Sequence, residues 1–151
     1  MEAINLASDS EKDDTQDEFK LRLEQAYEKY VLKAGSQEKR LIFKNKINEK
    51  MKMYMIIDGR NLTYVLGDAE LSDKFFKVGL LANSVICCRV SPKQKSLVVA
   101  LAKNNKKCIT LSIGDGANDV PMIMEAHIGI GISGKEGTQV IYFANFIIFK
   151  H

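Results

Sequence analysis

The chain has 151 residues, 46% of them apolar, which is enough for the core of one ordinary domain. Its 22 basic and 19 acidic side chains leave a net charge of +3 without an arginine-rich run, so we expect no nucleic-acid partner. The three cysteines show neither the even pairing of a disulfide framework nor the spacing of a zinc site.

The first third of the chain is predicted to be a charged helical segment. It contains equal numbers of acidic and basic side chains and a single glycine. Thr15 and Glu18 have the spacing of a capping box, and an apolar stripe of helical period follows until Gly35. We therefore expect residues 1–52 to form a helical connector without chemistry of its own, and residues 53–151 to form an α/β unit.

The pattern changes to short apolar runs that alternate with stretches of helical period. The runs are MYMIID, SVICC, CITLSIG, HIGIGI and NFIIF. Runs that are apolar on both faces and separated by amphipathic stretches are typical of parallel strands joined by crossover helices. The sequence therefore predicts an α/β fold with a mostly parallel sheet, in which ligands bind beyond the carboxyl ends of the strands.

The stretch IGDGANDVP begins at the end of the third of these runs. Asp115 and Asp119 would repel each other at a strand end unless a cation or a proton lay between them, and oxygen ligands favour magnesium. Gly114 and Gly116 permit a tight turn, and Asn118 can cap the helix that follows. This loop is therefore predicted to hold a magnesium ion.

Lys95, in SPKQKS, follows the neighbouring predicted strand SVICC, so its ammonium group can reach the same crevice. A lysine, a metal ion and carboxylates together suit phosphoryl transfer, in which positioning and charge neutralisation supply most of the catalysis. The alternative without chemistry is that Lys95 is a solvated helix residue and Asp115 only a turn former.

Two long stretches, ICCRVSPKQKSLVVALAK and ITLSIGDGANDVPMIMEAHIGIGISGKEGTQ, together closely resemble the phosphorylation domain of P-type ATPases, in the phospholipid-transporting (flippase) branch. MYMIIDGRNLTYVL is similar to the strand that leads back from the nucleotide-binding domain of that family. The resemblance covers residues 53–151. It implies an incomplete haloacid-dehalogenase-like Rossmannoid fold, a three-layer sandwich with a mostly parallel sheet, preceded here by the helical segment.

The resemblance also implies a function, in which ATP phosphorylates an aspartate and hydrolysis of the aspartyl phosphate drives a phospholipid between leaflets. Asp115 and Asp119 would bind Mg²⁺, Lys95 would neutralise phosphoryl oxygens, and Asn118 and Asp119 would organise the phosphate and its hydration. The residues that would contact ATP or its phosphates are Arg89, Lys95, Gly114, Gly116 and Asn118.

The chain also departs from the family pattern. The nucleophile sequence Asp-Lys-Thr-Gly-Thr and the phosphate-binding sequence Thr-Gly-Asp-Lys do not occur, and Asn145 stands where the family usually has an aspartate, which puts a local salt bridge in doubt. We expect a soluble piece of the cytosolic part of an integral membrane ATPase, inactive alone. Its partners would be the remaining domains and, through a membrane domain absent here, the phospholipid.

Two other functions remain open at this point. Asp58 also ends an apolar run, and a soluble phosphatase of the same superfamily carries its nucleophile at that kind of position. Such phosphatases usually have a general acid two residues later, where this chain has Arg60, which cannot protonate a leaving group. The third possibility is a regulatory module that keeps the fold without transport.

Overall fold

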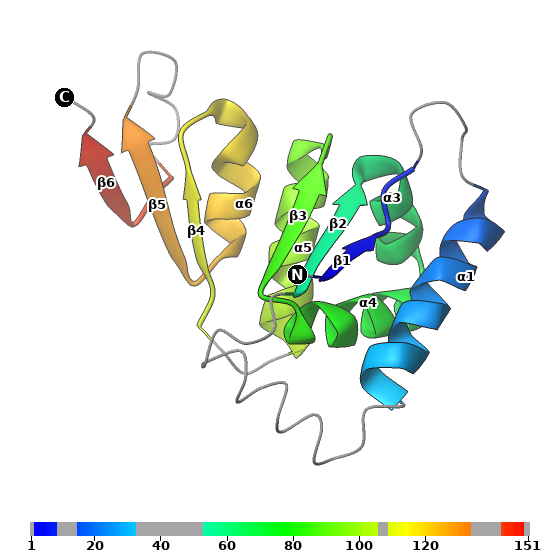
Figure 1. The fold of residues 1–151 in the computed structure, drawn as a ribbon. Coiled ribbons are helices and arrows are strands. Elements are labelled where there is room, and N and C mark those ends of the chain that lie inside the picture. Colours follow the sequence, from blue (N-terminus) through cyan, green and yellow to red (C-terminus); the bar gives the residue numbers. More distant parts are fainter. Residues whose placement is uncertain (1, 9–14, 33–52, 106–108, 134–142, 150–151) are drawn as a thin grey trace. The chain divides into compact units, whose positions relative to one another are not determined.

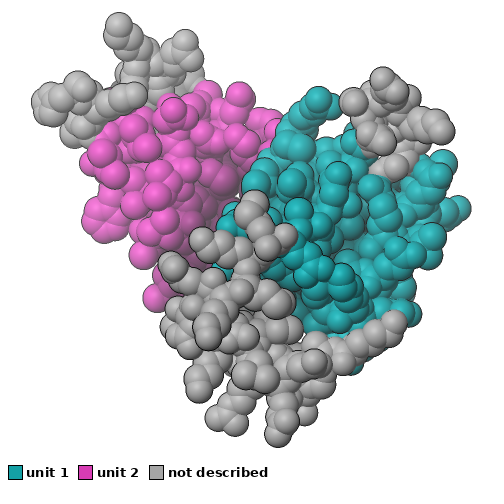
Figure 2. Space-filling view, viewed as in Figure 1, with its two compact units in different colours: residues 1–89 teal, residues 90–151 magenta. Residues whose placement is uncertain are grey.

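The computed structural model describes residues 2–8, 15–32, 53–105, 109–133 and 143–149 (Figure 1). The chain divides into two compact units, residues 1–89 and 90–151, and each is described by itself (Figure 2). Each unit contains a three-stranded sheet in which all strands run parallel. The predicted α/β class is confirmed, and all five apolar runs contain a strand. Over the described parts of the chain, no helix has the length and apolar character that a membrane crossing needs.

The sheet of the first unit has the order β1-β2-β3, so that β2 lies in its centre. Its strands are β1 (Glu2–Asn5), β2 (Met53–Asp58) and β3 (Ser84–Cys88). The helical elements are α1 (Gln16–Tyr27), the π-helical turn η1 (Glu28–Leu32), α3 (Gly59–Gly67) and α4 (Ala69–Leu81). Met55 and Ile57 of β2 are fully buried because the strand has neighbours on both edges and α3 packs against it.

Strand β1 lies inside the segment that the sequence predicts to be helical. It pairs in parallel with β2, with Ile4 opposite Met55, and both side chains are buried. Leu6 continues the pairing by donating its N–H to the Ile56 carbonyl at 2.7 Å. Four residues are too few to show a strand period, so the sequence does not predict this strand. Residues 33–52 lie outside the described residues, and the boundary between connector and α/β unit stays a prediction.

Helix α1 begins with the predicted capping box. The Thr15 hydroxyl accepts a hydrogen bond from the Glu18 N–H at 3.3 Å, and the Glu18 carboxylate accepts one from the Thr15 N–H at 3.1 Å. The helix packs on α3 and α4. Its buried stripe consists of Phe19, Leu23 and Ala26.

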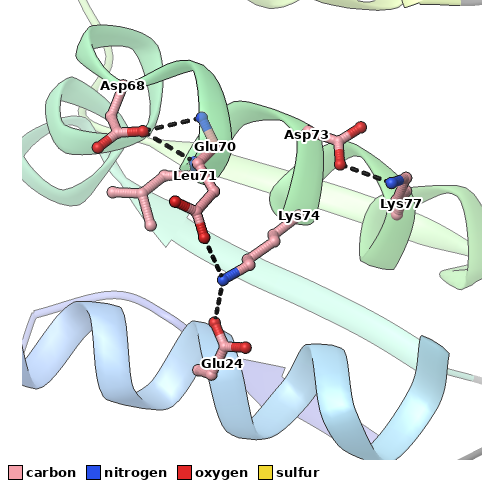
Figure 3. A network of polar contacts seen from close by, with 7 residues as sticks. All are labelled: Glu24, Asp68, Glu70, Leu71, Asp73, Lys74 and Lys77. Carbon is pink, nitrogen blue, oxygen red and sulfur yellow. Dashed lines mark hydrogen bonds and ion pairs between the residues drawn. The ribbon is translucent and has the colours of Figure 1, made fainter. Parts of the chain in front are cut away.

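Ion pairs at the surface also join α1 to α4. Lys74 of α4 pairs with Glu24 of α1 and, at 2.8 Å, with Glu70 one turn earlier on α4 (Figure 3). Lys77 pairs with Asp73 at 2.6 Å in the same network. Because these carboxylates are 41 to 76% exposed, each pair is worth less than about 1 kcal/mol. The buried apolar stripe therefore contributes more than the charges to the docking of α1.

The sheet of the second unit has the order β4-β5-β6. Its strands are β4 (Leu111–Gly114), β5 (Ile128–Ser133) and β6 (Phe146–Phe149). Its helical elements are α5 (Pro92–Asn105), the short 3₁₀ turn η2 (Ala117–Asp119) and α6 (Val120–Glu125). The chain passes from β4 through η2 and α6 to β5, which is the crossover that parallel neighbours require.

Helix α6 packs against β4 and β5 (Figure 1). Its buried anchor is Ile123, which is 1% exposed. A Cβ at Gly129 would lie 2.6 Å from Ile123 Cγ2, so glycine at this position lets the helix approach the strand closely. Asn145, just before β6, accepts a hydrogen bond through Oδ1 from the Gly129 N–H at 2.7 Å. An amide carbonyl thus supplies an acceptor, without a charge, where the resemblance implies an aspartate.

Candidate functional site

The acidic loop (residues 114–119) follows β4 and is built around a close contact between Gly114 and Asp119. A Cβ at Gly114 would lie 2.3 Å from the Cβ of Asp119, so a side chain there would displace the aspartate. Gly116 has open space around the corresponding position, and none of the described glycines has a positive φ. The two predicted turn glycines therefore differ, because Gly114 makes room for a carboxylate and Gly116 does not.

The carboxylate of Asp119 is the centre of the loop. Its Oδ1 accepts a hydrogen bond from Lys95 Nζ at 2.7 Å, and its Oδ2 accepts the N–H groups of Asp115 at 3.2 Å and Gly116 at 3.4 Å. Partial burial raises the pKa of Asp119, but the Lys95 ion pair and the two N–H groups outweigh it and hold the pKa below its usual value. The predicted meeting of Lys95 with the acidic loop is therefore present in the structure.

Asp115 presents the exposed carboxylate of this loop. Its backbone N–H is held by Asp119, whereas its side chain has no hydrogen bond or ion pair among the described residues. The Asp115 carboxylate can therefore bind a hydrated cation without first breaking an internal contact. Its backbone position is meanwhile fixed by the hydrogen bond to Asp119.

The prediction that Asn118 caps the next helix is wrong. Asn118 lies inside η2, and α6 begins at Val120 with Asp119 in the N-cap position. Pro121 does lie in the first turn of α6, and the helix does end at Glu125, as predicted. The exposed amide of Asn118 is thus not used for capping, and its predicted role toward phosphate stays a prediction.

The donor set of the loop fits a magnesium ion in part. Among the described residues, no three His, Cys, Asp or Glu side chains come together as metal ligands. Mg²⁺ is commonly held by one or two carboxylates, with water and substrate phosphate completing the octahedron, so Asp115 alone can supply one ligand. Asp119 already carries the ammonium of Lys95, and its contacts favour an organising role over direct coordination.

Arg89, the predicted nucleotide contact, directly follows β3 and closes the first unit. Its φ of 53° places it in the left-handed region, as for no other non-glycine residue that the structure describes. This backbone conformation costs about 1–2 kcal/mol for a residue with a Cβ. Strain of this size occurs often at ligand-binding positions, but the role of Arg89 stays a prediction.

Asp58, the nucleophile of the phosphatase alternative, is 5% exposed at the end of β2. Its Oδ1 accepts the Asn61 N–H at 2.9 Å as the N-cap of α3, and its Oδ2 accepts the Ser8 N–H at 2.9 Å and the Ser8 hydroxyl. Burial raises the pKa of Asp58, but these donors outweigh it and lower the pKa. Both oxygens are thus held by the fold, which disfavours a nucleophilic role. The sequence gives no signal for Ser8, because the contact spans fifty residues.

The chain is similar to parts of several phospholipid-transporting ATPases, although no family model matches it. A phospholipid-transporting ATPase of Schizosaccharomyces pombe is 53% identical over 96 residues, which cover 64% of this chain and 8% of the relative. The human phospholipid-transporting ATPase VA is 49% identical over 96 residues (64% of this chain, 6% of the relative). A probable phospholipid-transporting ATPase of Arabidopsis thaliana is 46% identical over 129 residues (76% of this chain, 10% of the relative).

The chain is homologous to a segment of the phospholipid-transporting P-type ATPases. It spans about a tenth or less of the length of the curated relatives that it matches. The parallel α/β architecture agrees with the phosphorylation-domain fragment that the resemblance implies. Within this flippase-like segment, the acidic loop and Lys95 are the residues whose geometry suits phosphoryl chemistry.

Proposed function

We propose that this chain is a C-terminal part of the phosphorylation domain of a phospholipid-transporting ATPase. There it supplies the groups that stabilise an aspartyl phosphate while lipid is moved across a membrane. The observation that carries the proposal is the Lys95–Asp119 ion pair at the carboxyl end of β4, in a chain about half identical to such ATPases. The parent protein would be membrane-bound, with this part in the cytosol.

Asp115 would be a magnesium ligand. Its carboxylate is exposed and not used internally, and its backbone is fixed through Asp119. Bound Mg²⁺ would neutralise charge on the phosphoryl oxygens. Water, the phosphate and the aspartyl nucleophile of the parent protein would complete its coordination, because this chain offers one unengaged carboxylate in the loop.

Lys95 brings the positive charge to the phosphoryl group, and Asp119 holds it there. The ammonium group has three N–H donors, so it can keep its bond to Asp119 Oδ1 and still donate to a phosphate oxygen. Asp119 also holds the N–H groups of Asp115 and Gly116, which fixes the lysine and the metal ligand relative to each other. Asn118 and Arg89 would contact the phosphate and the nucleotide, respectively.

This chain by itself is proposed to bind Mg²⁺ without turning over ATP. The sequence Asp-Lys-Thr-Gly-Thr, which contains the family's nucleophile, does not occur in it. Without an attacking carboxylate, Lys95 and Asp115 can stabilise charge but cannot accept a phosphoryl group.

Magnesium titration of the ¹⁵N-labelled chain, followed by NMR, tests the proposal. We expect the amide resonances of residues 115–118 to move with Mg²⁺ in the wild-type chain. The movement should be lost in Asp115→Ala and kept in Asp58→Asn, whose carboxylate belongs to the fold of the first unit. Resonances that move equally in wild type and Asp115→Ala would contradict the metal site.

Activity assays separate this function from the phosphatase alternative. The wild-type chain should hydrolyse neither MgATP nor a generic aryl phosphate. Aryl phosphatase activity that disappears in Asp58→Asn would favour the phosphatase with Asp58 as nucleophile. MgATP turnover that disappears in Asp115→Ala would instead show that the chain is active without the missing nucleophile sequence.

A further inference from the structure

We propose that Lys103 is a positioning residue of this site. Together with Lys95 it forms a two-lysine clamp, by which α5 holds both ends of α6 and so sets the position of Asp119. The inference deepens the proposed function and rests on it for the metal-binding part of its test. Lys103 does not reach the acidic loop itself, so its action would pass through α6.

The first observation is the contact at the end of α6. Lys103 Nζ donates to the backbone carbonyl of Glu125 at 2.9 Å and to its carboxylate at 3.3 Å. Glu125 is the last residue of α6, where helix carbonyls lack partners within the helix. A cation at this end also interacts favourably with the helix dipole. Lys103 therefore binds the end of the helix as well as one of its side chains.

The second observation is the contact at the other end. Asp119 directly precedes α6 and accepts the ammonium of Lys95 at 2.7 Å. Lys95 and Lys103 both belong to α5, a helix of 14 residues, so one element carries the attachment points of both side chains. Asp119 and Glu125 bracket α6 in the same way.

The third observation is that α6 is too short to hold its own position. It has six residues, and isolated helices shorter than about 12 residues are marginal in water. Its place is therefore decided by its contacts, which include packing on α5, β4 and β5, Ile123 against Gly129 in the middle and the two lysines at the ends. Loss of the Lys103 contact would remove one tie at the end of the helix and so favour a small pivot of α6 about Ile123. Such a pivot moves Asp119 relative to Lys95 and to β4.

The test uses a readout in the folded state, which a uniform loss of stability would not move. The N–H groups of Asp115 and Gly116 donate to Asp119 Oδ2, so their proton chemical shifts report the position of that carboxylate. We expect both resonances to move upfield in Lys103→Met, because a weakened hydrogen bond deshields the proton less. Mg²⁺ affinity should fall by about tenfold, as for other residues that orient a ligand.

Lys93→Met is the matched control. Lys93 lies in the first turn of the same helix, is exposed, and makes no hydrogen bond or ion pair among the described residues. It removes the same charge from α5 and should move neither amide resonance nor the Mg²⁺ affinity. Lys103→Arg should restore both, because the guanidinium group can donate to the carbonyl and the carboxylate together.

Glu125→Gln gives a milder second variant if Lys103→Met does not fold. It keeps the backbone carbonyl contact and removes the charge, so it should move the two resonances in the same direction by a smaller amount. Resonances that coincide with those of Lys93→Met in every variant that folds would overturn the clamp. A wild-type chain that binds no Mg²⁺ would overturn the proposed function instead, and the amide resonances would still decide the role of Lys103.

Discussion

In each of the two units, aspartate side chains lie at or just after the carboxyl end of a parallel strand. Their hydrogen-bond partners differ. Asp58 ends β2, and its oxygens are taken by the first turn of α3 and by Ser8. In the second unit, Asp119 holds Lys95 and two loop amides, which leaves the neighbouring Asp115 exposed. Position in the sheet therefore does not separate carboxylates that the fold engages from those that it leaves exposed, but the donors around them do.

The largest expected effect is on stability, at Asp58. Asp58→Ala removes an N-cap and both contacts to Ser8 from a buried site, so we expect the free energy of unfolding to fall by about 3 kcal/mol. Urea unfolding measures this loss. Asp68→Ala is the matched control, because Asp68 caps α4 with its carboxylate but has no long-range partner among the described residues, and it should cost only about 1 kcal/mol.

Equal losses in the two variants would mean that the tie to Ser8 contributes nothing. In that case the contacts of Asp58 would no longer indicate a structural role. A nucleophilic role, as in the phosphatase alternative, would regain support.

The two glycines of the acidic loop should respond differently to the same substitution. Gly114→Ala would place a Cβ 2.3 Å from Asp119 Cβ, so we expect a loss of about 2 kcal/mol in stability, the usual cost of overpacking. Mg²⁺ binding should be lost as well, because Asp119 must move. Gly116→Ala meets open space at a φ of −129°, so its stability should stay within about 0.5 kcal/mol of wild type. A Gly114→Ala chain that keeps its Mg²⁺ affinity would contradict the role of Asp119 as organiser.

The sequence predicts much of the second unit, because its signals are local. The apolar runs contain the strands, and Lys95 meets Asp119 as expected. The predicted reason is wrong, because β3 and β4 belong to different sheets and are not paired neighbours. The loop itself differs, because Asn118 lies inside a 3₁₀ turn and Gly114 is needed for space.

In the first unit the deciding contacts are distant in sequence. Strand β1 pairs with β2 across about fifty residues, and Ser8 reaches Asp58 over the same separation. Neither contact leaves a periodic pattern or a motif, since each depends on where the folded chain brings two short segments together. The structural role of Asp58 is therefore visible only in the structure.

Acid unfolding distinguishes the two carboxylates by the charge of their partners. The pKa values of Asp58 and Asp119 are both lowered in the folded state. Each therefore contributes stability that is fully present above about pH 4, the usual unfolded pKa, and is lost as the pH falls through the lowered value. We expect Asp58→Asn and Asp119→Asn each to flatten the fall of the unfolding free energy below pH 4.

Salt should separate the two contributions. The partner of Asp119 includes an ammonium ion that is 31% exposed, and 1 M salt screens such a pair, whereas the donors to Asp58 named above are neutral. The slope that remains in Asp58→Asn should therefore shrink in salt more than the slope that remains in Asp119→Asn. If salt reduced the two remaining slopes equally, the charge of Lys95 would contribute little to the lowered pKa of Asp119.

The smallest expected effect concerns Arg89, the strained last residue of the first unit. Arg89→Gly relieves a left-handed backbone but adds flexibility to the unfolded chain, so we expect stability to rise by no more than about 1 kcal/mol. Arg89→Lys is the control, because it keeps the strain and the charge and should leave stability unchanged. If the Arg89 side chain contacts the nucleotide, Arg89→Gly should gain stability and lose affinity for ATP. Isothermal titration calorimetry measures that affinity. A glycine variant that gains stability at full ATP affinity would show that the strain serves another purpose than nucleotide binding.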